Sequence, residues 1–136
     1  EKAQMQDQLE RDTVDAVGDV RAAMQRNVQT LQALLASMEQ AADRQDLSGY
    51  YKLNLEFHEL LMKIASNQTL ADLYLSIVRQ THLFRRRGLV QQGSLKTSNE
   101  EHGEIVQALA RGDAIAAEQS LTRHVARGWE RLAAAP

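Results

Sequence analysis

The first 135 residues of this chain contain no proline, and the only proline is the last residue, Pro136. No residue of the strongest helix-breaking type therefore interrupts the chain. Ala, Leu, Gln, Glu and Arg, which all favour helix, are abundant, and apolar residues recur at intervals of three to five. No stretch of any length alternates apolar and polar residues as a half-buried strand does. We therefore expect an all-α protein.

The periodic segments predict one domain, an antiparallel bundle of about six helices that encloses a cavity for a metal or ligand. The expected helices cover residues 1–26, 27–42, 47–65, 69–89, 98–110 and 113 to about 130. Asn27, Asp46 and Asp113 are expected as N-caps, and Ser98 with Glu101 forms an S-x-x-E capping box. The residues expected on the inward face of the last helix are Ile115, Ala116, Leu121, Val125 and Trp129.

Composition excludes several classes of protein. The formal net charge of −2 gives no basic surface for nucleic acid, and no apolar run approaches the roughly 20 residues that a membrane span needs. The absence of cysteine excludes disulfides and thiolate metal sites and fits a reducing compartment, so we expect a cytoplasmic protein. No signal peptide is visible, and the chain begins with Glu1 rather than Met, so we expect a piece of a longer protein.

The four histidines and one asparagine are the candidate ligands. Asn54 and His58 are four residues apart and so share one face of the third expected helix. His102 lies near the start of the fifth expected helix, and His124 lies at the inward margin of the sixth. Three imidazoles and one amide oxygen suit zinc, nickel, cobalt or iron and leave coordination positions open. A lone helical histidine is more often a packing or surface residue, as we expect for His82, so the spacing leaves a metal site and ordinary packing both open.

Arginines supply the candidate anion-binding groups. Arg85, Arg86 and Arg87 end the fourth expected helix, where cations are stabilised by the helix dipole, and are most simply a solvated helix end. In the functional reading, Arg85 or Arg86 turns inward and binds a carboxylate through a bidentate fork. Arg79 and Arg11 are further candidates for this role.

Several motifs follow one another in a recognisable order, at Asn54-Leu-Glu-Phe57-His58, Ala65-Ser66-Asn67-x-x-Leu70, Glu101-His102-x-x-Ile105-x-x-Ala108-Leu109-x-x-Gly112-Asp113, Ala117 and His124. Together they resemble the FadR-type C-terminal (FCD) ligand-binding domain of GntR-family bacterial transcription regulators. The resemblance extends from about Arg11 to Trp129. Each motif alone is modest, whereas their order and spacing are specific.

The resemblance implies a helical bundle in which an acid and three histidines hold a divalent metal, with zinc or nickel expected. Carried over by position, the ligands are Asn54, His58, His102 and His124, with Asn54 replacing the Asp that is usual in the family. It also implies a small carboxylate effector bound beside the metal, a homodimer, and DNA binding through an N-terminal winged helix-turn-helix domain that this chain lacks. Whether the parent protein represses or activates stays open.

Two other classes of function remain as alternatives, although we expect the chain not to be an enzyme. Three histidines with an open position also describe the metal of a hydrolase. Its general base would come from the acids near the histidines in sequence, which are Glu56, Glu59, Glu101 and Glu104. The remaining class is a metal-free helical interaction module.

Overall fold

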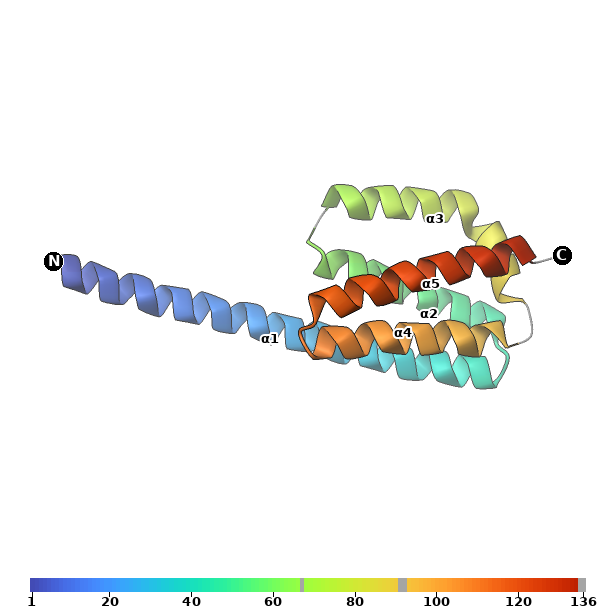
Figure 1. Cartoon of the computed structure of the whole chain (residues 1–136), viewed down its shortest axis with the longest axis horizontal. Helices are drawn as coiled ribbons and strands as arrows, with labels where there is room; N and C mark the ends of the chain where they lie inside the picture. Colours follow the sequence, from blue (N-terminus) through green and yellow to red (C-terminus); the bar gives the residue numbers. More distant parts are fainter. Residues whose placement is uncertain (67, 91–92, 135–136) are drawn as a thin grey trace.

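A computed structural model of the chain describes residues 1–66, 68–90 and 93–134, with the side chains of all these residues except Leu70 and residues 80–89. The described residues form five helices and no strand, which confirms the all-α prediction (Figure 1). The helices are α1 (Lys2–Asp43), α2 (Leu47–Ile64), α3 (Gln68–Leu89), α4 (Ser94–Ala110) and α5 (Ala114–Ala134). Among the described residues, none of these helices has the length and apolarity needed to cross a membrane.

The first helix is longer than the sequence indicated. A helix boundary at Asn27 is wrong, because α1 runs unbroken from Lys2 to Asp43 and joins two of the six expected helices. The apolar positions Met24, Val28 and Leu31 continue on one face across Asn27 at helical spacing. With no proline or glycine at this point, nothing in the local sequence ends the helix.

Side-chain caps begin two of the helices as predicted. The Asp46 carboxylate accepts a hydrogen bond of 2.9 Å from the Gly49 N–H at the start of α2. The Asp113 carboxylate accepts a bond of 3.0 Å from the Ala116 N–H at the start of α5. Each cap satisfies a backbone donor that the first helical turn leaves without an intrahelical partner. Gly112, in the left-handed conformation with φ of 69°, separates α4 from α5.

The start of α4 differs from the expected one. Gly93, with φ of 79°, precedes the helix, which begins at Ser94. Ser98 is therefore inside α4 and buried, so the prediction of a capping box with Glu101 is wrong. The four additional residues also move His102 from the first turn of its helix to the third.

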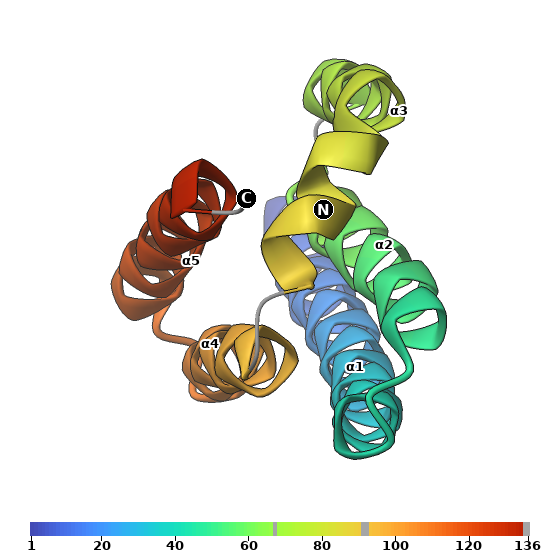
Figure 2. The ribbon, with the colours of Figure 1, turned by 90° about the vertical axis from the view of Figure 1, so that its right-hand side faces the viewer.

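The helices pack as a closed ring. α1 lies against α2 and α4, α3 lies against α2 and α5, and α4 lies against α5. Figure 2 shows the five helices from one end of the bundle. The largest fully buried side chains come from α1, α2 and α4 and fill the core: Leu31, Met38, Tyr50, Phe57, His102 and Ile105. The ring thereby surrounds a buried centre to which α2, α4 and α5 each contribute.

The inward face of the last helix matches the predicted one only in part, because Ala116 and Leu121 are partly buried, and Leu121 packs against the core, whereas the other three predicted residues are exposed. Ile115, Val125 and Trp129 were expected to point inward, and they are 71%, 62% and 72% exposed. α5 instead buries Ala117 and His124. Polar partners on α4, described below, hold this side of α5 inward and leave the three exposed residues outside.

Candidate metal centre

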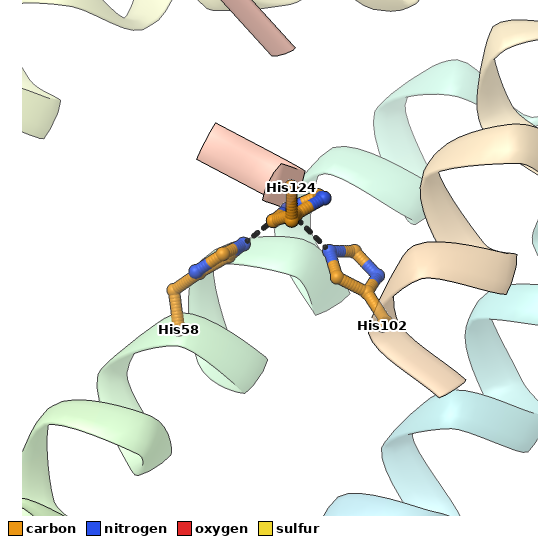
Figure 3. A group of neighbouring side chains, drawn as sticks. All are labelled: His58, His102 and His124. Atoms are coloured by element: carbon orange, nitrogen blue, oxygen red, sulfur yellow. Dashed lines mark hydrogen bonds between the residues drawn. The ribbon is translucent and has the colours of Figure 1, made fainter. Parts of the chain in front are cut away.

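Three histidines from three helices meet in the interior. His58 on α2, His102 on α4 and His124 on α5 offer ligand nitrogens that all lie within 4.8 Å of one another. The Nε2 atoms of His102 and His124 are 3.1 Å apart, and those of His124 and His58 are 3.4 Å apart (Figure 3). All three residues are at most 7% exposed. Residues separated by up to 66 positions thus present the same ring atom to one point.

Neighbouring rings fix where these imidazoles lie. The Phe57 ring centroid is 4.6 Å from that of His102 and 5.6 Å from that of His58. The Tyr50 ring stacks over His102 from one side with a centroid distance of 6.4 Å. Tyr50 and Phe57 are themselves fully buried in the core. Because packed aromatic rings cannot shift without opening the core, the imidazoles are held in place before any ligand arrives.

The outer nitrogen of His124 is bonded to a buried carboxylate. The His124 Nδ1–H donates to Glu101 Oε1 at 2.9 Å. The Arg131 guanidinium donates to both oxygens of the same carboxylate, at 2.9 and 3.2 Å. Glu101 is only 3% exposed, so this is an interior network that ties α4 to the end of α5. With its proton on Nδ1, His124 presents a lone pair on Nε2.

The outer nitrogen of His102 has two polar neighbours, the Asn99 side chain and the Tyr50 hydroxyl. The Asn99 amide nitrogen donates to the Leu35 carbonyl at 3.2 Å, which leaves Asn99 Oδ1 facing His102. Asn99 Oδ1 and the Tyr50 hydroxyl each lie 3.4 Å from His102 Nδ1, so the His102 proton is on Nδ1 when Asn99 accepts it and on Nε2 when Tyr50 donates to Nδ1. In the first tautomer His102 Nε2 carries a lone pair directed at His124 Nε2, and in the second it donates a hydrogen bond to His124 Nε2.

Two nitrogen lone pairs that face each other at 3.1 Å repel unless a proton or a cation lies between them. Two nitrogens bound to one tetrahedral zinc with bonds of about 2.05 Å are about 3.3 Å apart. The separations of 3.1 and 3.4 Å match this spacing. The donor set and its geometry therefore fit a divalent cation of the zinc type.

The charge on Glu101 is maintained despite its burial. Burial raises the pKa of this carboxyl group. Hydrogen bonds from Arg131 and His124, together with their positive charges, lower the pKa by a larger amount, so that it lies below its ordinary value. Glu101 is thus a carboxylate at neutral pH and holds the proton of His124 on Nδ1. A metal-bound histidine oriented by a carboxylate in this way is a common arrangement in proteins.

Asn54 lies one turn before His58 on α2 and is 5% exposed. Its side-chain oxygen is buried and has no hydrogen-bond partner within the described part of the chain. A buried amide oxygen without a partner costs free energy, which a cation ligand would recover. This is the position that the sequence assigned to the oxygen donor.

The structure describes the side chains of two of the four predicted arginines, Arg11 and Arg79. Arg11 lies in the exposed first half of α1 and donates to Gln8 at 3.2 Å (Figure 1). Arg79 is exposed on α3. The side chains of Arg85 and Arg86, like that of His82, lie outside the described residues.

The structure adds Arg131, which the sequence analysis did not name, and gives Glu101 a role other than the helix cap or general base suggested there. A signal for them existed in the sequence. Glu101 directly precedes His102, and Arg131 follows His124 by seven residues, which is two helical turns on the same face.

The acids suggested as general bases do not favour a hydrolase. Glu56, Glu59 and Glu104 are exposed. Glu101 is buried, but both of its oxygens already accept hydrogen bonds from His124 and Arg131. A carboxylate with a lowered pKa and occupied lone pairs is a poor proton acceptor at neutral pH.

Comparison with known proteins gives one match. The family model described as the FCD domain matches residues 3–127, which is most of the chain. No curated protein and no solved structure matches. The matched region includes all three histidines of the cluster.

Proposed function

This chain belongs to the FCD domain family, and from that premise we propose that it is the effector-sensing domain of a GntR-type bacterial transcription regulator. The observation that supports this most strongly is the convergence of three buried histidines, whose ligand nitrogens all lie within 4.8 Å of one another. Residues 1–136 would form one sensing domain, and the parent protein would bind DNA through a separate N-terminal winged helix-turn-helix domain.

The three histidine Nε2 atoms and Asn54 Oδ1 would hold a divalent metal, zinc or nickel. When bound, the ion would supply positive charge and an open coordination position in a site that excludes bulk water. Other residues of the chain would hold the ligating histidines in the orientation and tautomer that metal binding needs. Glu101 would hold His124 in the binding tautomer, Asn99 would do the same for His102, and Phe57 would keep the rings of His58 and His102 in place.

The effector would be a small carboxylate. Three neutral imidazoles and a neutral amide leave the charge of a divalent ion uncompensated, which favours an anionic ligand at the open position. An arginine would form the second contact, and the candidates are Arg79, Arg85 and Arg86, because Arg11 lies on the half of α1 that projects from the bundle. Because Asn54 stands where a carboxylate is usual, this site would depend more on the effector for charge balance than one with Asp.

Effector binding would favour one packing of α2, α4 and α5 over another, since each helix carries one histidine. An effector shifts such an equilibrium only by the difference in its affinity for the two packings. α1 packs against both α2 and α4, so it would transmit the change toward the DNA-binding domains of a cytoplasmic homodimer.

Isothermal titration calorimetry of small mono- and dicarboxylates tests this function. We expect binding to zinc-loaded protein and at least tenfold weaker binding after chelation and dialysis. His58→Ala should behave like the stripped protein, whereas Glu59→Ala, an exposed neighbour on α2, should behave like the wild type. Equal affinities for loaded and stripped protein would rule out an effector site at the metal.

A further inference from the structure

The three buried histidines are close enough to hydrogen-bond one another when no metal lies between them (Figure 3). Glu101 holds the proton of His124 on Nδ1, so His124 Nε2 is an acceptor. His102 Nε2 lies 3.1 Å from this acceptor, and His58 Nε2 lies 3.4 Å from it. Two lone pairs at the shorter distance repel, whereas an N–H donor at 3.1 Å makes a hydrogen bond of ordinary length. A proton on His102 Nε2 therefore satisfies both rings without a metal.

The Tyr50 hydroxyl supplies the donor that this tautomer of His102 needs on its other nitrogen. Tyr50 Oη lies 3.4 Å from His102 Nδ1, and neither residue has any exposed surface. Burial raises the pKa of the Tyr50 hydroxyl well above its ordinary value, so this group keeps its proton and remains a donor. The Ser98 side chain is also hydrogen-bonded to Tyr50 and can donate to its oxygen, which leaves the Tyr50 O–H for His102.

With the His102 proton on Nε2, these contacts form one continuous chain of hydrogen bonds across three helices. The chain runs from Tyr50 on α2 through His102 on α4 and His124 on α5 to Glu101 and Arg131. From Tyr50 to Glu101 every donor points the same way, and hydrogen bonds arranged head to tail in a buried site strengthen one another. The metal-free site is thereby closed by the chain's own donors and acceptors.

Metal binding needs the other tautomer of His102. A ligating nitrogen must present a lone pair, so Nε2 gives up its proton and Nδ1 carries it. Asn99 Oδ1 accepts on that side, because its amide nitrogen is held by the Leu35 carbonyl at 3.2 Å. Tyr50 and Asn99 both lie 3.4 Å from Nδ1, so distance favours neither partner and the 3.1 Å contact with His124 decides between them.

We propose that Tyr50 is a positioning residue that keeps the His102 proton on Nε2 in the metal-free chain and thereby opposes metal binding. In the metal-binding tautomer the Nε2–H bond is broken and an Nδ1–H bond is formed, so the imidazole stays neutral. The Tyr50 hydroxyl keeps its proton and turns to Ser98. The Tyr50–His102 bond, which joins α2 to α4, is thus exchanged for the Asn99–His102 bond within α4. This exchange rests on the proposed function for the metal, and it is one difference between the helix packings that the function requires.

Long-range nitrogen–proton NMR spectra of the chelator-treated protein test the tautomer without any metal. We expect wild-type His102 to carry its proton on Nε2 and His124 to carry its proton on Nδ1. Tyr50→Phe keeps the buried ring and removes only the hydroxyl, so it should fold and should increase the share of His102 with the proton on Nδ1. A wild-type His102 protonated on Nδ1, or on both nitrogens, would overturn the proposal.

Zinc affinity tests the effect on binding. Tyr50→Phe should raise the affinity roughly three- to tenfold, because one hydrogen bond no longer stabilises the metal-free state. Asn99→Ala should lower it by a similar factor, because it removes the acceptor for the Nδ1 proton. Glu100→Gln, at the exposed position next to Asn99, is the control and should change neither the tautomer nor the affinity. A hydroxyl with a purely structural role would leave the affinity unchanged or lower it when removed, and either result would overturn the proposal.

The two measurements separate this inference from the proposed function. A wild type with His102 protonated on Nε2 that binds no zinc or nickel would support the metal-free hydrogen-bond chain and refute the function. Zinc binding that Tyr50→Phe weakens would refute the role of Tyr50 and leave the metal centre intact. Circular dichroism of each variant checks the fold, and the wild-type spectra together with Tyr50→Phe decide the matter if Asn99→Ala does not fold.

Discussion

Glu101 Oε1 lies 2.9 Å from His124 Nδ1, a contact between α4 and α5 in the interior of the bundle. This contact determines both the tautomer of His124 and the face of α5 that is turned inward. It places the His124 proton on the outer nitrogen, which leaves Nε2 directed at the other two histidines. With Arg131, it also holds inward the face of α5 that carries His124, and thereby leaves Val125 and Trp129 outside.

Replacing Glu101 by Gln should weaken zinc binding about 10–100-fold, as is usual when the partner of a metal-bound histidine is removed. The neutral amide no longer fixes the His124 tautomer, and Arg131 loses its charged partner. Competition with a chromophoric chelator measures the affinity, and long-range nitrogen–proton NMR spectra report the tautomer. Glu100→Gln, the exposed neighbour on α4, should leave both unchanged; equal loss in the two variants would contradict the assigned role.

The same carboxylate should affect acid stability. Its pKa in the folded chain lies below the ordinary value of 4.5, so it stabilises the fold above that pH and ceases to do so as pH falls through the folded pKa. The free energy of unfolding in urea should therefore fall more steeply between about pH 5 and pH 3 for the wild type than for Glu101→Gln, measured without metal. Parallel curves for the two proteins would contradict a lowered pKa.

Replacing Asn54 by Asp should strengthen zinc binding by tenfold or more, because a carboxylate donates more strongly than an amide oxygen and adds a charge opposite to that of the ion. Without metal the same variant should melt at a lower temperature than the wild type, since it buries an uncompensated carboxylate. The two measurements should thus change in opposite directions. An unchanged zinc affinity would show that Asn54 is not a ligand.

Leu31 lies in the part of α1 that packs in the bundle, three residues after the buried Val28, and is completely buried. Leu31→Ala should lower the free energy of unfolding by about 2–5 kcal/mol, through lost transfer free energy and the cavity left behind. Val14→Ala, at an exposed position of the same helix, should change it by less than about 0.5 kcal/mol. Denaturant unfolding of both variants provides the comparison, and a small effect at Leu31 would contradict the core described here.

The all-α fold could be predicted because helix periodicity is a local property, visible wherever apolar residues recur every three to four positions. The caps at Asp46 and Asp113 could be predicted for the same reason. The helix boundary at Asn27 could not, because a residue suited to a cap is also tolerated within a helix when the flanking apolar face continues across it.

Part of the centre could also be predicted from the sequence. His58, His102 and His124 were named in advance, and the structure brings them together. The role of Glu101 was missed, because it depends on Arg131, 30 residues away, and on His124 on another helix. The same distant partners turn the His124 side of α5 inward, so local periodicity correctly placed Leu121 against the core but wrongly placed Val125 and Trp129 there.

The zinc content and affinity of the purified domain test the central claim most directly. We predict one zinc or nickel per chain by elemental analysis after purification without chelator, and a clear fall in melting temperature when the metal is removed. A His102→Ala, His124→Ala variant should retain none. A wild type that contains no metal, binds none on addition of zinc or nickel, and melts at the same temperature with and without chelator would contradict the account.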